Sequence, residues 1–257
     1  MRRRSVRLLA ALALGALLVA CGSDEQGGDG GGVTGSITVG AASSLTASFT
    51  ELGDAFEGAN PGVDVTFDFG ASSEVVQGIN EGAPTDVFAS ADTKNMDKLV
   101  AGAGVAADPQ VFATNQLQII VGKGNPQAVT GVADLANPDL LVVACSPEVP
   151  IGGYTQQVFD AAGVKVTPVS LEENVKSIVT KVTLGEADAG VVYRTDVIAA
   201  ADKAEGVDIP ADINVTAKYP IAVTKDAANA TVANAFVAFV LSPDGQTILQ
   251  KYGFGAP

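Results

Sequence analysis

Residues 37–49 read ITVGAASSLTASF, and this stretch decides the fold class. It opens as a short β-branched strand pattern, and apolar residues then recur every three or four positions from Leu45 to Phe56, as on one face of a helix. Two serines, Ser43 and Ser44, stand at the corner where the strand pattern gives way to the helix pattern. A strand that runs into a helix through a corner of small residues is the repeating unit of an α/β fold.

The same alternation continues to the end of the chain. VDVTFDF at 63–69 alternates apolar and polar residues, as a half-buried strand does, and a second corner, GASS at 70–73, leads into the next helix pattern. The apolar runs at 117–124 and 140–145 are typical of central strands buried on both faces. Further strands are predicted at 85–90, 164–169, 189–193 and 218–224, and helices at 93–101, 173–184, 227–241 and 244–251. This order predicts an α/β fold in which helices flank a mixed β-sheet.

A chain of 257 residues is long enough for two lobes. No linker rich in Pro, Gly or Ser divides it after residue 36, but the extended stretches 113–122 and 216–223 have the character of crossings between lobes. We therefore predict a first lobe made of 37–115 plus 220–257, and a second lobe made of 116–219.

The N-terminus has the pattern of an export signal. MRRRSVR is positively charged, residues 8–20 are apolar, and LLVAC ends in Cys21, which resembles a bacterial lipobox. A membrane-spanning helix is the alternative, but the apolar run is too short to span comfortably. The sequence predicts a signal peptide at 1–20, lipidation of Cys21 and a flexible Gly-rich linker at 21–36. The protein would then lie outside the cytoplasm, held to the membrane by its lipid.

The net charge of −14 restricts the partners of the chain. Arg2, Arg3, Arg4 and Arg7 all lie in the leader, so the rest is more acidic still. This acidity argues against nucleic acid or an anionic membrane surface as a partner. A basic patch for anions is not expected either.

The chain contains no histidine. That excludes a Ser-His-Asp triad and any His-ligated metal site. A catalytic pair of carboxylates stays open as an alternative, although no corner of the chain holds two acids in a suggestive position. Cys145, at the end of an apolar run, is interpreted as a small buried hydrophobic residue. We expect neither an enzyme nor a cofactor.

The two Ser-Ser corners indicate a site for an anion. A helix N-terminus has free N–H groups and partial positive charge, and serine adds an O–H donor beside them. Small neighbours such as Gly40 and Gly70 let the backbone approach a ligand closely. Helix capping by serine is the alternative explanation for each corner.

Longer stretches carry a family resemblance. They are ITVGAASSLTASF, FDFGASSEVVQGINEGAPTDVFASAD, VPIGGY, VSLEENVKSIVTKVTLGEADAGVVYRTDV, YPIAV and the terminal SPDGQTILQKYGF. Together they resemble the ModA family, the substrate-binding proteins of bacterial molybdate ABC transporters. The match runs in order over nearly all of residues 36–254.

This resemblance implies a two-lobed periplasmic-binding-protein fold of type II that closes on its ion by a hinge. It also implies that uncharged donors hold a tetrahedral oxyanion. Matched motif by motif, the hydroxyl donors fall on Ser44 and Ser72, the backbone N–H donors on Ile151 and Val175, and the phenolic donor on Tyr193. The same five residues would hold molybdenum as its oxyanion.

The chain departs from the family pattern in places. Ile151 stands where small residues are usual, and Ser43 beside Ser44 leaves open which hydroxyl points inward. Glu172 and Glu173 are interpreted as solvated acids in the first turn of a helix.

The resulting hypothesis is a monomeric protein that captures molybdate, or tungstate, outside the membrane and delivers it to an ABC permease. A carrier for another oxyanion such as sulfate or phosphate is the alternative within the same class. A structural surface lipoprotein without a ligand is a third reading.

Overall fold

The computed structural model describes residues 32–257. The predicted signal peptide at 1–20, the predicted lipidation at Cys21 and most of the predicted linker at 21–36 lie outside the described residues.

Within residues 32–257, nine strands pair in the order β2-β1-β3-β9-β4-β7-β5-β6, and β8 also pairs with β4. The strands are β1 Gly35–Ala42, β2 Val63–Gly70, β3 Val87–Ala89, β4 Gln110–Gly122, β5 Val142–Cys145, β6 Ser170–Glu172, β7 Ala189–Tyr193, β8 Ala204–Asp208 and β9 Thr216–Val223. The helices are α1 Thr46–Ala59, α2 Ser72–Asn80, α3 Thr93–Ala101, α4 Pro150–Ala162, α5 Val175–Leu184, α6 Arg194–Ala199, α7 Ala230–Leu241 and α8 Pro243–Lys251, with short 3-10 segments η1 Ser43–Leu45 and η2 Val132–Ala136. This confirms the predicted α/β fold with a mixed sheet and flanking helices.

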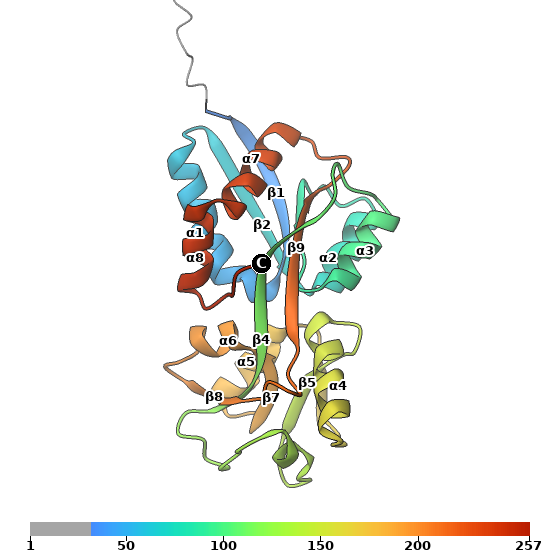
Figure 1. Ribbon diagram of the computed structural model, residues 1–257, viewed down its shortest axis with the longest axis vertical. Helices are drawn as coiled ribbons and strands as arrows, with labels where there is room; N and C mark the ends of the chain where they lie inside the picture. The colour runs from blue at the N-terminus through green and yellow to red at the C-terminus, as the bar shows by residue number, and fades with distance from the viewer. Residues whose placement is uncertain (1–31) are drawn as a thin grey trace, which may run out of the picture. The chain divides into compact units, whose positions relative to one another are not determined.

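Two lobes are visible in Figure 1. The first lobe holds β1 to β3 with α1, α2, α3, α7 and α8, and the second lobe holds β5 to β8 with α4, α5 and α6. β4 and β9 run through both, as expected for crossings between lobes. β4 pairs with β9 over 110–116 and then with β7 over 117–121. The predicted lobe boundaries therefore fall inside these two strands, and their position within them stays a prediction.

Parallel pairing sets the position of the strand ends. In the first lobe β1 pairs in parallel with β2 and β3, so Ala42 lies opposite Gly70, and Ala41 lies opposite Ala89. In the second lobe β5 pairs in parallel with β6 and β7. The carboxyl ends of parallel strands meet at one edge of a sheet, which is where ligands bind in open α/β folds.

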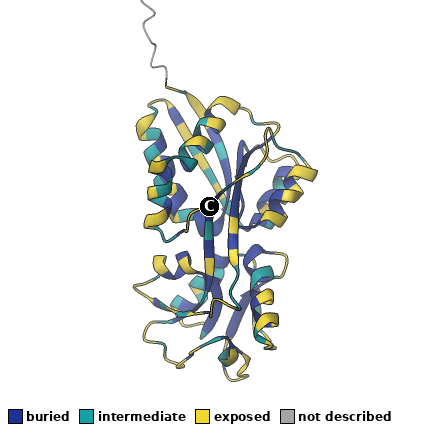
Figure 2. Cartoon of the chain, in the orientation of Figure 1, coloured by how far each residue is buried: buried dark blue, intermediate teal, exposed yellow. Residues whose placement is uncertain are grey.

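Each lobe has a hydrophobic core beneath its helices, and Figure 2 shows mostly buried strands between helices whose outer faces are exposed. In the first lobe the predicted apolar face of α1 is buried, and Phe56 lies edge-on to Phe236 of α7, with ring centroids 5.4 Å apart. The spacing of apolar residues from Leu45 to Phe56 therefore reports correctly which face of α1 is inside.

One predicted strand was misplaced, and one strand was not predicted. The strand expected at 164–169 begins only at Ser170, because Pro168 has no N–H group to give to a neighbouring strand. β8 was not predicted, since its sequence AEGVD has only one apolar β-branched residue and lies at an edge of the sheet. Gly152 and Gly153 lie inside helix α4.

Among the described helices, none alone is both long and apolar enough to cross a membrane. Helices α7 and α8 are long and apolar enough only when they are counted as one segment, and their axes differ by 62°.

Candidate functional site

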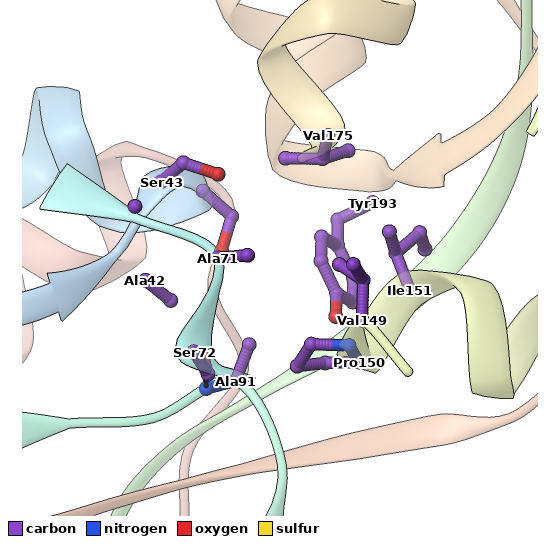
Figure 3. A pocket seen from close by; sticks show the side chains of 12 residues that line it. Ala42, Ser43, Ala71, Ser72, Ala91, Val149, Pro150, Ile151, Val175 and Tyr193 are labelled. Carbon is purple, nitrogen blue, oxygen red and sulfur yellow. Dashed lines mark hydrogen bonds between the residues drawn. The ribbon is translucent and has the colours of Figure 1, made fainter. Parts of the chain in front are cut away.

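A small cavity lies where helix starts from both lobes face one another (Figure 3). It is lined by Ala42, Ser43, Ser44, Gly70, Ala71, Ser72, Ala91, Val149, Pro150, Ile151, Val175 and Tyr193. All five residues assigned by resemblance are in this set, although they come from four separate strand–helix corners and one strand end. Within residues 32–257, no charged side chain lines the cavity.

The first Ser-Ser corner follows β1 directly. Ser43 and Ser44 form the 3-10 segment η1, and both are buried. The Ser44 Oγ lies 3.0 Å from the hydroxyl of Tyr219 on β9, whereas the Ser43 hydroxyl points toward the gap between the lobes in Figure 3. Neither serine caps α1, which begins at Thr46 behind Leu45. Both hydroxyls are therefore near the cavity, and the adjacent pair is not explained by capping.

The second corner presents Ser72 as the first residue of α2. Its Oγ accepts a hydrogen bond from the backbone N–H of Ala91, at 3.0 Å. Because the oxygen is already an acceptor, the hydroxyl hydrogen is available to a guest in the cavity. The capping position is Ala71, whose N–H donates to the carboxylate of Glu74 at 3.2 Å. The capping explanation is therefore wrong for Ser72 as well.

Two backbone donors come from the second lobe. Ile151 is the second residue of α4, after Pro150 at the first position, and Val175 is the first residue of α5. The first N–H groups of a helix have no partner within the helix and carry its positive end. Both residues are almost fully buried, at 1% and 3% exposure. They can offer amide donors in a place that water hardly reaches.

Tyr193 ends β7 and is the most unusual of the five. It is 1% exposed, and its hydroxyl has no hydrogen-bond partner among the described residues. Burial, then the nearby Tyr219, raises the pKa of the Tyr193 phenol well above its usual value, so the group stays protonated. A buried polar group without a partner costs free energy. It is explained if a guest accepts its hydrogen bond.

Two charged side chains, Asp196 and Lys176, lie next to cavity-lining residues and form an ion pair with each other. Asp196 in α6 is fully buried; it accepts the backbone N–H of Tyr193 at 3.2 Å and pairs with the Lys176 Nζ at 2.9 Å. Burial raises the pKa of Asp196, and Lys176 opposes that rise. The pair holds the ends of β7 and α5 together without adding a net charge to the site.

The two acids near Val175 do not enter the cavity. Glu172 lies in strand β6, not in a first helical turn, and it is buried against Lys181 and Ser170. The expectation of a solvated helical acid was wrong here because Asn174 caps α5 and delays its start to Val175. Glu173 is exposed, as expected, but it also precedes the helix.

Cys145 matches its predicted role as a buried hydrophobic residue. It ends β5 at 3% exposure and is a free thiol. Burial, followed by the charge of Glu172, raises the pKa of the thiol, which leaves it inert as a nucleophile. Within the described residues, no group of three or more His, Cys, Asp and Glu side chains is placed to hold a metal ion.

The sequence did not predict the residues that hold the cavity serines in place. Ala91 fixes the Ser72 oxygen, and Tyr219 contacts Ser44 from the crossing strand β9. The only signal for these contacts is the position of Tyr219 inside a predicted crossing, because pairing between distant strands cannot be read from spacing along one segment.

Comparison with known proteins agrees with this geometry. The family model described as bacterial extracellular solute-binding protein matches residues 37–255. The molybdate-binding protein ModA of Mycobacterium tuberculosis is 42% identical over 243 residues, which cover 93% of each chain. The chain belongs to the ModA family of bacterial extracellular solute-binding proteins.

Solved structures agree with this ModA fold. The periplasmic molybdate-binding protein of Azotobacter vinelandii matches with a TM-score of 0.72 at 24% identity, over 86% of this chain and 99% of the other. The sulfate-binding protein SubI of Mycobacterium tuberculosis matches with a TM-score of 0.75 at 20% identity, over 86% of each chain. The two-lobed fold thus occurs with more than one named anion, and the fold alone does not choose between them.

Proposed function

We propose that this ModA-family protein binds molybdate, or tungstate, outside the cytoplasm and delivers it to an ABC permease. The observation that supports it is a cavity lined by donors in which, within residues 32–257, no charged side chain takes part and one phenol has no hydrogen-bond partner. A fully ionised oxyanion only accepts hydrogen bonds, so hydroxyls and amides suit it. Hydrogen bonds to a charged acceptor are stronger than bonds between neutral groups.

The proposed ligands are the hydroxyls of Ser44 and Ser72, the amides of Ile151 and Val175, and the phenol of Tyr193. The first two belong to the first lobe and the other three to the second. An anion between them joins the lobes, so hinge closure would complete the set of donors. No further cofactor is proposed, and we expect no turnover.

Selectivity in this proposal has two sources. Sulfate is smaller than molybdate and would leave some donors out of reach. Protonated phosphate carries a donor of its own, and within the described residues no carboxylate lines the cavity to accept it. Ile151, which stands where small residues are usual in the family, also lines the cavity and would favour a close fit if its side chain occupies part of it.

Attachment to the membrane through Cys21 is part of the proposal. Supporting it are the lipobox-like sequence and the linker that follows it. The family is extracellular. A lipid would keep the monomer near its permease while the linker leaves it free to capture anions. Mass spectrometry of the native membrane-bound protein tests this, since an unmodified Cys21 would contradict it.

Calorimetry with molybdate, tungstate, sulfate and phosphate tests the central claim. We expect tight binding of molybdate and tungstate and weak or no binding of the other two. Tight binding of sulfate or phosphate, with no heat from molybdate, would reassign the protein to another oxyanion. Absence of binding and of thermal protection by all four would favour a structural lipoprotein.

A further inference from the structure

The hydroxyl of Tyr219 lies at the centre of a buried polar chain next to the cavity. Tyr219 is on β9 and has 0% exposure. Its oxygen is 3.0 Å from the Ser44 Oγ and 3.4 Å from the Nδ2 of Asn115 on β4. The same Asn115 nitrogen donates to the Thr195 Oγ1 at 2.9 Å. The chain thus reaches from α6, across both crossing strands, to the first Ser-Ser corner.

The direction of the hydrogen bonds follows from counting donors. The Asn115 amide nitrogen can only donate, so the Tyr219 oxygen is its acceptor. The single hydrogen of Tyr219 then needs an acceptor of its own, and of its two hydrogen-bond partners within the described residues, Asn115 and Ser44, the Ser44 oxygen is the one that can accept. If Ser44 donated to Tyr219 instead, the buried phenolic hydrogen would lose this partner, which costs free energy.

We propose that Tyr219 is a positioning residue that turns the Ser44 hydroxyl into an obligatory donor toward the cavity. With its oxygen occupied by Tyr219, Ser44 keeps one hydrogen, and the cavity is the side on which it lines the wall. Ser72 is arranged in the same way, because the Ala91 N–H occupies its oxygen. Each serine oxygen then has one lone pair occupied behind the cavity wall, and its hydrogen is free to be donated to the guest.

The arrangement also depends on both lobes. Ser44 belongs to the first lobe, Thr195 to the second, and Asn115 and Tyr219 lie on the strands that join them. The buried chain is therefore intact only when the lobes keep this relation to the crossing strands. The inference rests on the proposed function, since it explains how an acceptor-only anion is preferred.

A double-mutant cycle tests the role of Tyr219. The variants are Tyr219→Phe, Ser44→Ala and the double substitution, with molybdate Kd measured by calorimetry. We expect Tyr219→Phe to weaken binding about 10-fold, and to have almost no further effect when Ser44 is already alanine. Equal fold-changes in both backgrounds, or an unchanged Kd in the single variant, would overturn the proposal.

Controls separate positioning from a general loss of stability. Tyr252→Phe removes another phenol, whose hydroxyl donates to the Glu51 carboxylate at 2.7 Å. Tyr252 does not line the cavity, so this variant should leave the Kd for molybdate unchanged. Asn115→Ala is a second test should Tyr219→Phe fold poorly, because it removes the donor that sets the direction. Its effect should likewise vanish in the Ser44→Ala background.

Failure of the proposed function would look different. If the natural protein gives no molybdate heat, the cycle is repeated with whichever of tungstate, sulfate or phosphate raises its Tm most. Non-additivity with that anion still supports the role of Tyr219, and additivity contradicts it.

Discussion

At the scale of single residues, the hydroxyls proposed to bind the anion differ in how much they contribute to the stability of the fold. Tyr193 shows this most clearly, because its ring fills the core while its hydroxyl has no partner in the described part of the chain. Ser72 differs, since its oxygen already holds the Ala91 N–H. Loss of either hydroxyl should weaken anion binding. Only the loss of the Ser72 hydroxyl should destabilise the unliganded protein, because only that group makes a hydrogen bond within the described residues.

Tyr193→Phe is expected to weaken molybdate binding by roughly 1.5–3 kcal/mol, the range for a hydrogen bond to a charged group. The unliganded protein should be as stable as before or more stable, because an unpaired buried hydroxyl is removed. Calorimetry and denaturant unfolding without anion measure the two effects. Unchanged affinity would show that the phenol does not touch the guest.

Ser44→Ala and Ser72→Ala should each weaken binding by roughly 1.5–3 kcal/mol. Ser73→Ala is the matched control, because Ser73 is adjacent in sequence, only half-buried and absent from the cavity wall. Titration of the three variants with molybdate measures the difference. If Ser44 and Ser72 can each be replaced without effect on affinity, the donors lie elsewhere.

At the scale of elements, the start of helix α4 is fixed by backbone packing. A Cβ added at Gly152 would lie 2.0 Å from the carbonyl oxygen of Ser146, whereas one at Gly153 would lie 3.4 Å from the Pro147 oxygen. The helix therefore rests directly on the loop after β5, and this contact sets where the Ile151 amide points.

Gly152→Ala should displace the start of α4, destabilise the protein by about 1–3 kcal/mol as overpacking does, and weaken molybdate binding at least several-fold. Gly153→Ala should change both properties little. Unfolding curves and calorimetry on the pair of variants check this. Equal behaviour of the two alanine variants would contradict the proposed packing constraint.

A second contact between elements joins β6 to α5 through Glu172 and Lys181. Burial favours a raised pKa for Glu172, but hydrogen bonds from Lys181 and Ser170, with the charge of Lys181, outweigh burial and lower it. A lowered pKa gives stability that is present above the unfolded value, about 4.3, and is lost as pH falls through the folded value.

Glu172→Gln should therefore destabilise the protein at neutral pH, and the difference from the natural protein should shrink as the pH is lowered below about 4.3. Urea unfolding across this pH range measures it. A difference that stays constant with pH would mean that the carboxylate charge contributes nothing.

The sequence predicted elements better than it predicted contacts. Apolar spacing placed α1 and α3 well, and the parallel order of strands brought the predicted corners to one edge. The strand predicted at 164–169 was misplaced because Pro168 cannot donate to a neighbouring strand, and β8 was missed because AEGVD has only one apolar β-branched residue. The Tyr219 contact with Ser44 was missed because the two residues are far apart along the chain.

At the scale of the whole molecule, the cavity is assembled from both lobes, so an anion stabilises their association as well as each wall. Binding only to the folded protein raises the free energy of unfolding by RT ln(1 + [L]/Kd). The affinity for the anion therefore sets how far the anion raises the Tm, whatever the way in which the two lobes close.

Molybdate at about 100 times its Kd should add about 2.7 kcal/mol to the free energy of unfolding. The Tm should keep rising with the logarithm of the molybdate concentration. Differential scanning calorimetry of the natural protein checks this, with Tyr193→Phe needing proportionately more anion for the same rise. A Tm that does not respond to any oxyanion would contradict a ligand-binding role.

The pairing of β4 with β9 has a consequence for how the chain can be rearranged. Gln116 lies opposite Thr216, so the entry to and the exit from the second lobe are neighbours. The second lobe can therefore be regarded as an insertion in the first lobe, and replacing it would not change the positions at which the chain leaves and re-enters the first lobe. Exchanging the second lobe between relatives should transfer the proposed donors at the starts of α4 and α5 and at the end of β7, and leave the proposed serine donors with the first lobe.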